Sequence, residues 1–232
     1  MKRIRIVGLC LVAVFAMSAV AAASASASPT YKECAKVKAK TGKFATASCT
    51  TEGGTGTWEL VSPKKGAYTS TTKTATLATP GVGSVSCKTS KGTGTITSET
   101  AATTVVTFST CATSGKKCTS AGQKAGVIKT FELLGSLREP TAGTVETVVT
   151  GNGPEGLSAE FSCETITIKT RGSVGGVDTG DINTAGKKST ETFNEATGLE
   201  SEVVGLTPFL PSTQTATASV ATKSSIGIFG VA

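Results

Sequence analysis

Histidine is absent from the 232 residues of this sequence. Its side chain exchanges a proton near neutral pH more readily than any other, and it is the commonest metal ligand. Its absence excludes Ser-His-Asp and Cys-His hydrolytic mechanisms and every metal site that needs imidazole. A hydrolase built from this chain would have to use acidic residues, or a serine with a lysine.

Aromatic residues and long apolar runs are also scarce. Aromatics make up 5% of the sequence, and no long segment keeps an apolar period of 3.6 residues, so we expect little helix. Beyond the first 27 residues the last apolar run covers only 226–231, so we expect no transmembrane segment in the mature chain. No basic stripe carries interleaved aromatics, which argues against nucleic acid as a partner.

The N-terminus has the pattern of a secretory signal peptide. Lys2, Arg3 and Arg5 precede an apolar stretch over 6–23, and Ala-Ser-Ala occurs twice in tandem over 23–27 as a cleavage site. The short apolar run, closed by small residues, favours cleavage over retention as a membrane anchor. We therefore expect residues 1–27 to be removed and the protein to be secreted. The formal charge then falls from +7 to +4 (7 − 3), which suits a soluble chain.

What the sequence does contain favours β-structure. Thr, Ser, Gly and Ala dominate, and apolar and polar residues alternate without a break from Leu157 to Glu164. Further strands are predicted at 74–78, 83–88, 93–98, 103–110, 126–134, 144–150, 190–193, 202–206, 215–221 and 225–229. The fold class is all-β, an antiparallel sandwich or barrel, with the strand 157–163 expected to be the one around which the domain is organised.

A turn at Pro63-Lys64-Lys65-Gly66 predicts a boundary between two parts of the mature chain. Residues 28–66 would form a small N-terminal β subdomain with a disulfide loop, and residues 67–232 the main β-domain. The similar stretches 48–57 and 86–95 each suggest a strand, a glycine turn and a strand.

Six cysteines follow the signal peptide, and an even number in an exported chain predicts three disulfides. Six cysteines allow fifteen connectivities. Spacing and strand parity favour three of the possible pairs: Cys34 with Cys49, Cys111 with Cys118, and Cys87 with Cys163. A zinc cluster is disfavoured, because close Cys-x-x-Cys pairs are lacking.

Two short segments fit the Ser-x-x-Lys pattern in which lysine serves as a base, namely Ser62 to Lys65 and Ser114 to Lys117. Both fall in predicted turns, where a solvated loop is the better interpretation. Asp178-Thr179-Gly180 matches the triplet of aspartic proteases, but the chain has no second copy. A loop with an Asx turn is the simpler interpretation. Since Asp178 and Asp181 are the only aspartates, a weak calcium loop is the functional alternative.

Two other patterns carry weaker hypotheses. The glutamate pairs Glu160 with Glu164 and Glu200 with Glu202 could in principle serve glycoside hydrolysis, yet they fit the solvent face of strands. The segment 210–214, Leu-Pro-Ser-Thr-Gln, approaches a sortase signal, but glutamine replaces the glycine at the scissile position. A loop ahead of the last strands is favoured there.

A resemblance covers nearly the whole mature chain. The motifs that carry it are Tyr31, Cys34, Val37, Gly42-Lys43-Phe44, Cys49-Thr50, Ala75-Thr76-Leu77, Val85-Ser86-Cys87-Lys88, Val105-Val106-Thr107-Phe108, Cys111, Lys117-Cys118-Thr119-Ser120, Phe161-Ser162-Cys163, Arg171-Gly172-Ser173-Val174 and Thr215-Ala216-Thr217-Ala218. In these the chain resembles a family of uncharacterised exported proteins common in soil actinobacteria. The resemblance implies one exported β-domain stapled by disulfides, and it brings no activity, ligand or catalytic residue.

The functional expectation is a secreted, non-catalytic β-domain that binds a partner or serves as a scaffold at the cell envelope, with envelope glycan or a protein as the partner. No cofactor and no structural metal are expected. Two alternatives stay open. One is a histidine-free extracellular hydrolase that uses Glu and Asp or Ser and Lys. The other is a β-barrel carrier of a small apolar ligand.

The first test concerns processing. The exported protein is expected to lack residues 1–25 or 1–27, because cleavage follows the Ala-x-Ala pattern. N-terminal sequencing of the protein from culture fluid would return Ser26 or Ser28, whereas a sequence beginning at Lys2 would contradict the assignment.

Overall fold

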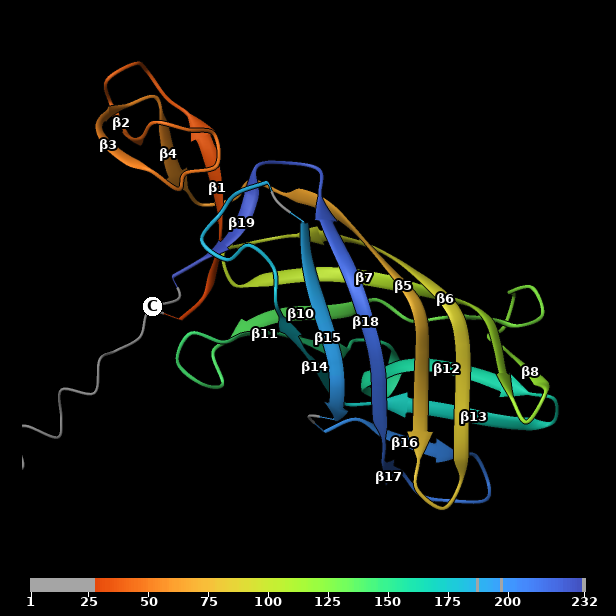
Figure 1. Cartoon of the computed structure of the whole chain (residues 1–232). Helices are drawn as coiled ribbons and strands as arrows, with labels where there is room; N and C mark the ends of the chain where they lie inside the picture. The colour runs from red at the N-terminus through yellow and green to blue at the C-terminus, as the bar shows by residue number, and fades with distance from the viewer. Residues whose placement is uncertain (1–27, 187, 197, 231–232) are drawn as a thin grey trace, which may run out of the picture.

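The computed structural model describes residues 28–186, 188–196 and 198–230, so the expected signal peptide lies outside the described residues. The described chain is almost entirely β-strand (Figure 1). Its one helical segment in those ranges is a 3-10 turn at Pro154–Gly156. The predicted all-β class is confirmed. No helix in the described ranges is long and apolar enough to cross a bilayer.

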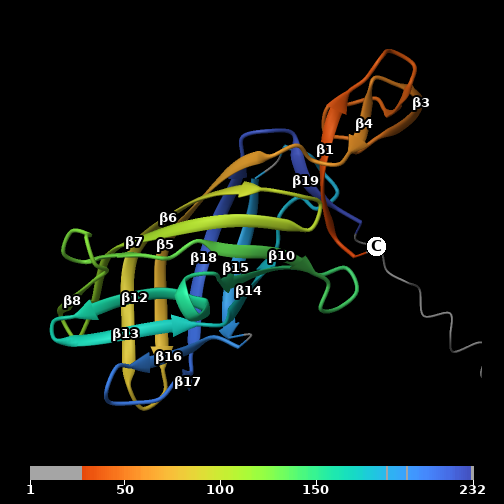
Figure 2. The same cartoon turned by 180° about the vertical axis from the view of Figure 1, so that it is seen from behind.

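Eight antiparallel strands close into a barrel. In order around the wall they are β10 (Leu133–Arg138), β11 (Val145–Gly151), β14 (Ser173–Asp178), β15 (Lys188–Ala196), β18 (Thr213–Thr222), β5 (Gly66–Thr79), β6 (Gly83–Ile96) and β7 (Ala101–Thr113). The pairing of β7 with β10, from Leu133 opposite Thr104 to Ser136 opposite Ala101, completes the circle. Figures 1 and 2 show this wall from opposite sides. Of the two architectures left open by the sequence, the chain adopts the barrel.

The long hairpin of β5 and β6 explains why so much threonine suits this fold. Its outward positions carry exposed polar side chains such as Thr71 and Thr93, while the inward positions carry buried ones such as Ala75 and Val85. Branched Thr favours the extended backbone, and its hydroxyl can face water.

The predicted glycine turns are wrong. Gly92 and Gly94 lie inside β6, and Gly53 and Gly56 inside β3 (Glu52–Gly56). At position 94 the strand requires glycine for a steric reason, because a Cβ there would lie 2.4 Å from Cζ of Tyr68. Glycine there leaves room for the Tyr68 ring against the wall.

A second group of strands continues the sheet beyond β7 and covers one end of the barrel. It consists of β8 (Lys116–Thr119), β12 (Leu157–Cys163), β13 (Ile166–Arg171), β16 (Glu200–Val203) and β17 (Leu210–Pro211). The short β9 (Val127–Lys129) pairs with β7. The alternation predicted for 157–163 is confirmed, since every second residue of β12 is buried. However, β12 is not a strand of the barrel, so the prediction that it organises the domain is wrong.

A small sheet lies at the opposite end of the barrel (Figures 1 and 2). Its strand order is β19-β1-β4-β2-β3, with β1 (Thr30–Lys36), β2 (Gly42–Phe44), β4 (Trp58–Val61) and β19 (Ile226–Phe229). The predicted boundary places residues 28–66 in the N-terminal subdomain and β19 in the main β-domain. In the structure β19 pairs with β1, from Thr30 opposite Phe229 to Glu33 opposite Ile226. Both ends of the described chain therefore meet in this sheet.

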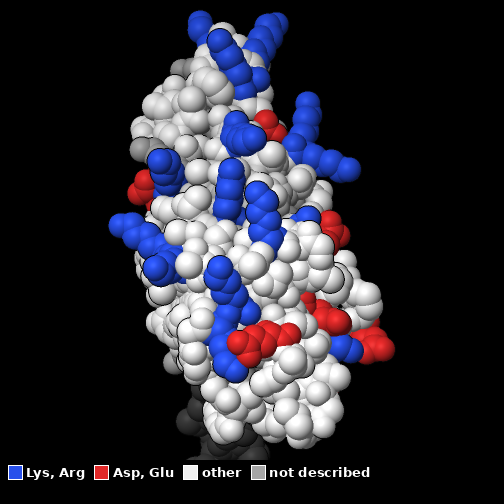
Figure 3. Space-filling view, turned by 90° about the vertical axis from the view of Figure 1, so that its right-hand side faces the viewer, with Lys and Arg blue, Asp and Glu red and all other residues white. Residues whose placement is uncertain are grey.

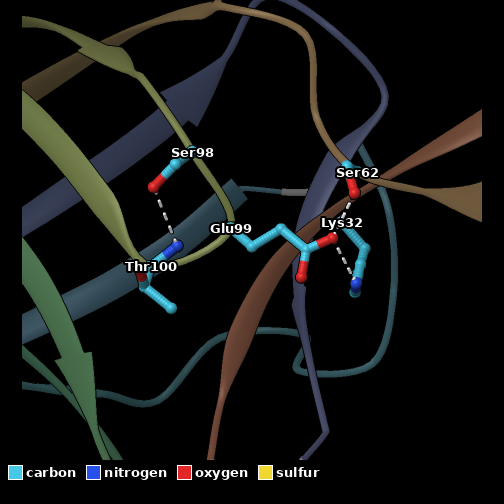
Figure 4. Close-up of polar contacts among 5 residues, drawn as sticks. All are labelled: Lys32, Ser62, Ser98, Glu99 and Thr100. Atoms are coloured by element: carbon cyan, nitrogen blue, oxygen red, sulfur yellow. Dashed lines mark hydrogen bonds and ion pairs between the residues drawn. The ribbon is translucent and has the colours of Figure 1, made fainter.

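Polar contacts join the small sheet to the barrel (Figure 4). Lys32 of β1 donates a hydrogen bond to Glu99, in the turn between β6 and β7, with 2.6 Å between Nζ and Oε1. Ser62 donates to the same carboxylate oxygen, and the Tyr31 amide donates to the Glu99 carbonyl. The Lys32 ammonium lowers the pKa of the Glu99 carboxyl. Since this ion pair is solvent-exposed, we expect it to orient the two parts more than to stabilise them.

The described residues form three disulfides, and only one of the expected pairs is among them. Cys34 is bonded to Cys49, as predicted. The other two expected pairs, Cys87 with Cys163 and Cys111 with Cys118, are wrong. Instead the structure pairs Cys87 with Cys111 and Cys118 with Cys163.

The corrected pairs follow from strand register. Cys87 and Cys111 lie directly opposite each other on β6 and β7, with 4.0 Å between their Cα atoms. Cys118 and Cys163 are register partners on β8 and β12, with 4.1 Å between Cα atoms. Parity correctly placed Cys87 and Cys163 on buried strand faces, but it does not say which strand is the neighbour.

Peptide mapping of the oxidised protein should recover Cys87 linked to Cys111 and Cys118 linked to Cys163. The double variant Cys87→Ala/Cys111→Ala should lower the free energy of unfolding by about 3 to 4 kcal/mol on the loop-entropy model, measured by urea denaturation. The Cys34→Ala/Cys49→Ala variant, which opens a shorter loop outside the barrel, serves for comparison and should cost about 3 kcal/mol on the same model. A fragment joining Cys87 to Cys163 would refute the register argument.

Candidate functional site

The turns predicted for the two Ser-x-x-Lys segments are confirmed only in part, because residues 62–65 form an irregular connection and the turn at 114–115 leads directly into β8, which contains Lys117. Ser62 follows β4, is exposed and donates its hydroxyl to Glu99. Ser114 lies between β7 and β8, where Lys116 forms an exposed ion pair with Glu164 at 2.7 Å. Among the described contacts, the Ser62 hydroxyl and the Lys116 ammonium each have an acidic partner, and neither serine is hydrogen-bonded to a lysine.

The glutamate pairs and the sortase-like segment also have structural roles. Glu160 lies 4.0 Å from Lys169, and Glu200 pairs with Arg171 at 2.8 Å on the exposed face of the side strands. The segment 210–214 is not a loop, because it contains β17 and the start of β18. Ser212 within it is 1% exposed and shares a hydrogen bond with Thr79 at 2.9 Å. Strand pairing therefore engages part of this segment, with Ser201 opposite Leu210 and Ala78 opposite Thr213.

The aspartic triplet lies at the end of β14. The amide of Gly180 donates to Oδ1 of Asp178 at 2.8 Å, which is the Asx turn expected there. Asp178 is 5% exposed and faces the barrel interior, whereas Asp181 is exposed in the loop that follows. Among the described residues no group of three or more acidic or cysteine side chains could hold a metal ion.

A cavity of about 210 Å³ occupies the barrel interior. One end is apolar, where Val85, Phe108, Ile128 and Phe161 pack around the disulfides. Hydroxyl groups of buried Thr72, Ser90 and Thr104 lie on the wall between the ends. This interior space is open enough for a molecule, unlike the filled cores of most small barrels.

The other end of the cavity is formed by the small sheet and the loop after β14. Tyr31 of β1 and Ile226 of β19 pack there with Ile96, Ala102 and partly buried Tyr68. Ile182 and Thr184 of the loop also line the cavity. The small sheet therefore supplies part of the cavity wall.

Two carboxyl groups lie at this second end. Asp178 on β14 and Glu191 on β15 are direct register partners and both line the cavity. Side chains in that relation have Cβ atoms roughly 5 Å apart. The Thr147 hydroxyl of β11 donates to Oε1 of Glu191 at 3.1 Å. The other carboxyl oxygen of Asp178, Oδ2, is buried and has no hydrogen-bond partner among the described residues.

Burial dominates the electrostatics of this end. It raises the pKa of Glu191 to about 7, and the nearby Asp178 carboxyl adds to the rise, while the Thr147 hydrogen bond opposes it. Burial also raises the pKa of Asp178, while the hydrogen bond from the Gly180 amide and the nearby polar Ser189 hydroxyl oppose the rise. The phenol of Tyr68 has its pKa raised to about 12 by burial, and that of Tyr31 is raised further. The site is a hydrogen-bonding, acidic pocket in an apolar wall.

The acidic interior contrasts with the outer surface. Figure 3 shows many basic side chains distributed along one face of the molecule, with fewer acidic ones scattered among them. Among the described residues that line the cavity, Asp178, Asp181 and Glu191 are charged and none is lysine or arginine. The described lysines and arginines therefore lie outside the cavity, and its interior carboxyls have no basic partner among the described residues.

Glu191 was missed by the sequence analysis, although a signal for it existed. The strand 190–193 was predicted, and strand parity puts Glu191 on the same face as Phe193, which is buried. An acidic residue on the apolar face of a strand is unusual enough to single out. Tyr31 had no such signal, because its position depends on how the small sheet docks.

The chain matches no known family model, and no curated protein or solved structure is significantly similar to it.

The raised pKa of Glu191 predicts a pH dependence of stability. A carboxyl whose folded pKa exceeds its unfolded value binds more protons when folded, so its contribution to stability is present at low pH and is lost as pH rises through about 7. The Glu191→Gln variant should match the wild type near pH 4 and exceed its free energy of unfolding by up to about 3 kcal/mol near pH 8.

Urea denaturation across that pH range measures the difference. Exposed Glu155 provides the control, because Glu155→Gln makes the same chemical change at the surface. A difference between Glu191→Gln and the wild type that stays constant with pH would contradict the burial of this carboxyl.

Proposed function

We propose that this chain is an exported, non-catalytic domain whose barrel binds a small ligand. The observation that carries the proposal is the interior cavity of about 210 Å³, which combines an apolar end with an end that carries carboxyl, hydroxyl and phenol groups. Small-molecule sites are mostly apolar concavities with a few convergent polar groups, and eight-stranded barrels are wide enough to hold one small ligand.

The volume limits the size of the ligand. A cavity of about 150 Å³ can hold benzene, whereas sites for drug-sized molecules measure roughly 300 to 1,000 Å³. The cavity of this chain lies between these limits. A ligand with roughly six to eight carbon atoms fits, and a glycan chain or folded protein would have to bind elsewhere.

The disulfides support a location outside the cytoplasm. Three cross-links suit an oxidising environment outside the cytoplasm, in agreement with the predicted signal peptide and with the resemblance to exported actinobacterial proteins. Membership of that family is part of this proposal. A stapled barrel would keep its cavity intact outside the cell, where conditions vary.

Hydrolysis is the second candidate function, and the Asp178 and Glu191 pair is the observation that favours it. Two neighbouring carboxyls with raised pKa values can divide the roles of acid and base. The enclosing wall restricts such chemistry to substrates that fit the cavity. Hydrolysis of small esters that is lost in both Asp178→Asn and Glu191→Gln would replace the binding proposal with an enzyme.

The binding proposal is tested by filling the cavity. Ser90 is buried on the inner face of β6, and Thr93 is exposed on the outer face of the same strand. Titration calorimetry with matched six-carbon probes, 1-hexanol, hexylammonium and hexanoate, should detect binding of at least one probe to the wild type. Ser90→Leu should weaken that binding tenfold or more, because the added side chain occupies the cavity.

Thr93→Leu is the matched control, since it adds the same side chain outside the barrel, and it should bind the probe as the wild type does. Equal binding to both variants would mean that the probe occupies another site. If none of the three probes binds the wild type, the cavity is not a ligand site.

A further inference from the structure

The acidic end of the cavity contains two carboxyl groups, Asp178 and Glu191, and no described residue that lines the cavity is a lysine or arginine that could serve as their counterion. The two residues face each other across β14 and β15. Buried charges in proteins are normally paired with an opposite charge, and like charges directly opposite each other on neighbouring strands are destabilising. The pair therefore disfavours a ligand with a negative group and favours a positive one.

A second, independent observation indicates where such a group would bind. Asp178 is 5% exposed, one of its carboxyl oxygens accepts from the Gly180 amide, and the other, Oδ2, is buried without a partner among the described residues. The side chain lines the cavity. A buried acceptor left unpaired is costly, so a donor supplied from the cavity would bind there favourably.

The surroundings distinguish an organic cation from a metal ion. Calcium takes six to eight oxygen ligands, and no group of three acidic or cysteine side chains in the described chain could hold a metal. Next to the carboxyls lie Phe193 on the adjoining wall and Ile96 and Ile226 in the apolar cluster around Tyr31. An apolar body attached to the cation would contact these side chains.

We propose that the ligand of the barrel is a small organic ammonium, whose N–H groups donate to Asp178 and Glu191 while its apolar body extends along the cavity. An ammonium group has three donors, enough for Oδ2 of Asp178 and for Glu191. Hydrogen bonds from a charged donor to a carboxylate are also stronger than neutral ones. The inference rests on the proposed binding function and names the chemical class of ligand.

The test compares hexylammonium, 1-hexanol and hexanoate, which share a six-carbon chain and differ in charge. At pH 8 hexylammonium should bind at least tenfold more tightly than 1-hexanol, and hexanoate more weakly than either. The preference of hexylammonium over 1-hexanol should shrink at least tenfold in Asp178→Asn/Glu191→Gln, with each single variant in between. It should also shrink at pH 5, where protonation of Glu191 removes its negative charge.

Three controls keep the outcome interpretable. Glu155→Gln, the exposed counterpart, should bind as the wild type does. The single variants are neutral substitutions of similar shape, and circular dichroism checks that each is folded. Calcium chloride is titrated alone and in competition, because displacement of hexylammonium by calcium would overturn the assignment in favour of a metal site.

The outcomes of this experiment distinguish failure of the ammonium inference from failure of the proposed ligand-binding function on which it rests. If 1-hexanol binds as tightly as hexylammonium, and Ser90→Leu abolishes both, the barrel is a ligand site but the ammonium inference is wrong. If hexylammonium binds preferentially and the carboxyl variants keep that preference, the cation binds elsewhere and the inference is again wrong. Binding of none of the probes overturns both proposals.

Discussion

The pairing of β7 with β10 is the constraint on which the rest of the structure depends. It joins the two ends of an eight-stranded wall, so that no barrel strand leaves an open edge and the interior is separated from solvent. That separation explains why carboxyls on β14 and β15 are desolvated although both strands lie at the surface of a small protein. Without closure, Asp178 and Glu191 would be ordinary solvated acids.

Closure also gives the two ends of the cavity different characters. At one end the strands β8, β12 and β13 pack against the barrel, and two disulfides lie within an apolar cluster. At the other end the small sheet places Tyr31 and Ile226 beside the barrel strands. Tyr31 of β1 is therefore part of the candidate site, because it helps to form the wall next to the two carboxyls.

Much of the fold could be predicted from the sequence, because alternation in a strand is a local property. The alternating run at 157–163 and the scarcity of helix led to the correct class, and Cys34 was paired correctly because its loop to Cys49 is short. The other disulfides and the role of β12 depended on which strands are neighbours, which is set by closure. One clue was available, since Cys87 and Cys111 lie equally far from Glu99 at the β6 and β7 turn. The candidate site could not be predicted from the sequence either, because it also depends on which strands closure makes neighbours. Parity alone marked Glu191 as an unusual acidic residue on an apolar strand face.

The central claim is that Glu191 faces a cavity in which a cation can reach it. Carbon-13 NMR of the glutamate side-chain carboxyls tests this most directly, by following the titration of Glu191 with and without hexylammonium. The account predicts a midpoint near pH 7 in the free protein, as its raised pKa implies, and a clearly lower midpoint when the ammonium is bound. A midpoint near pH 4.5 in the free protein, or one that hexylammonium leaves unchanged, would contradict it.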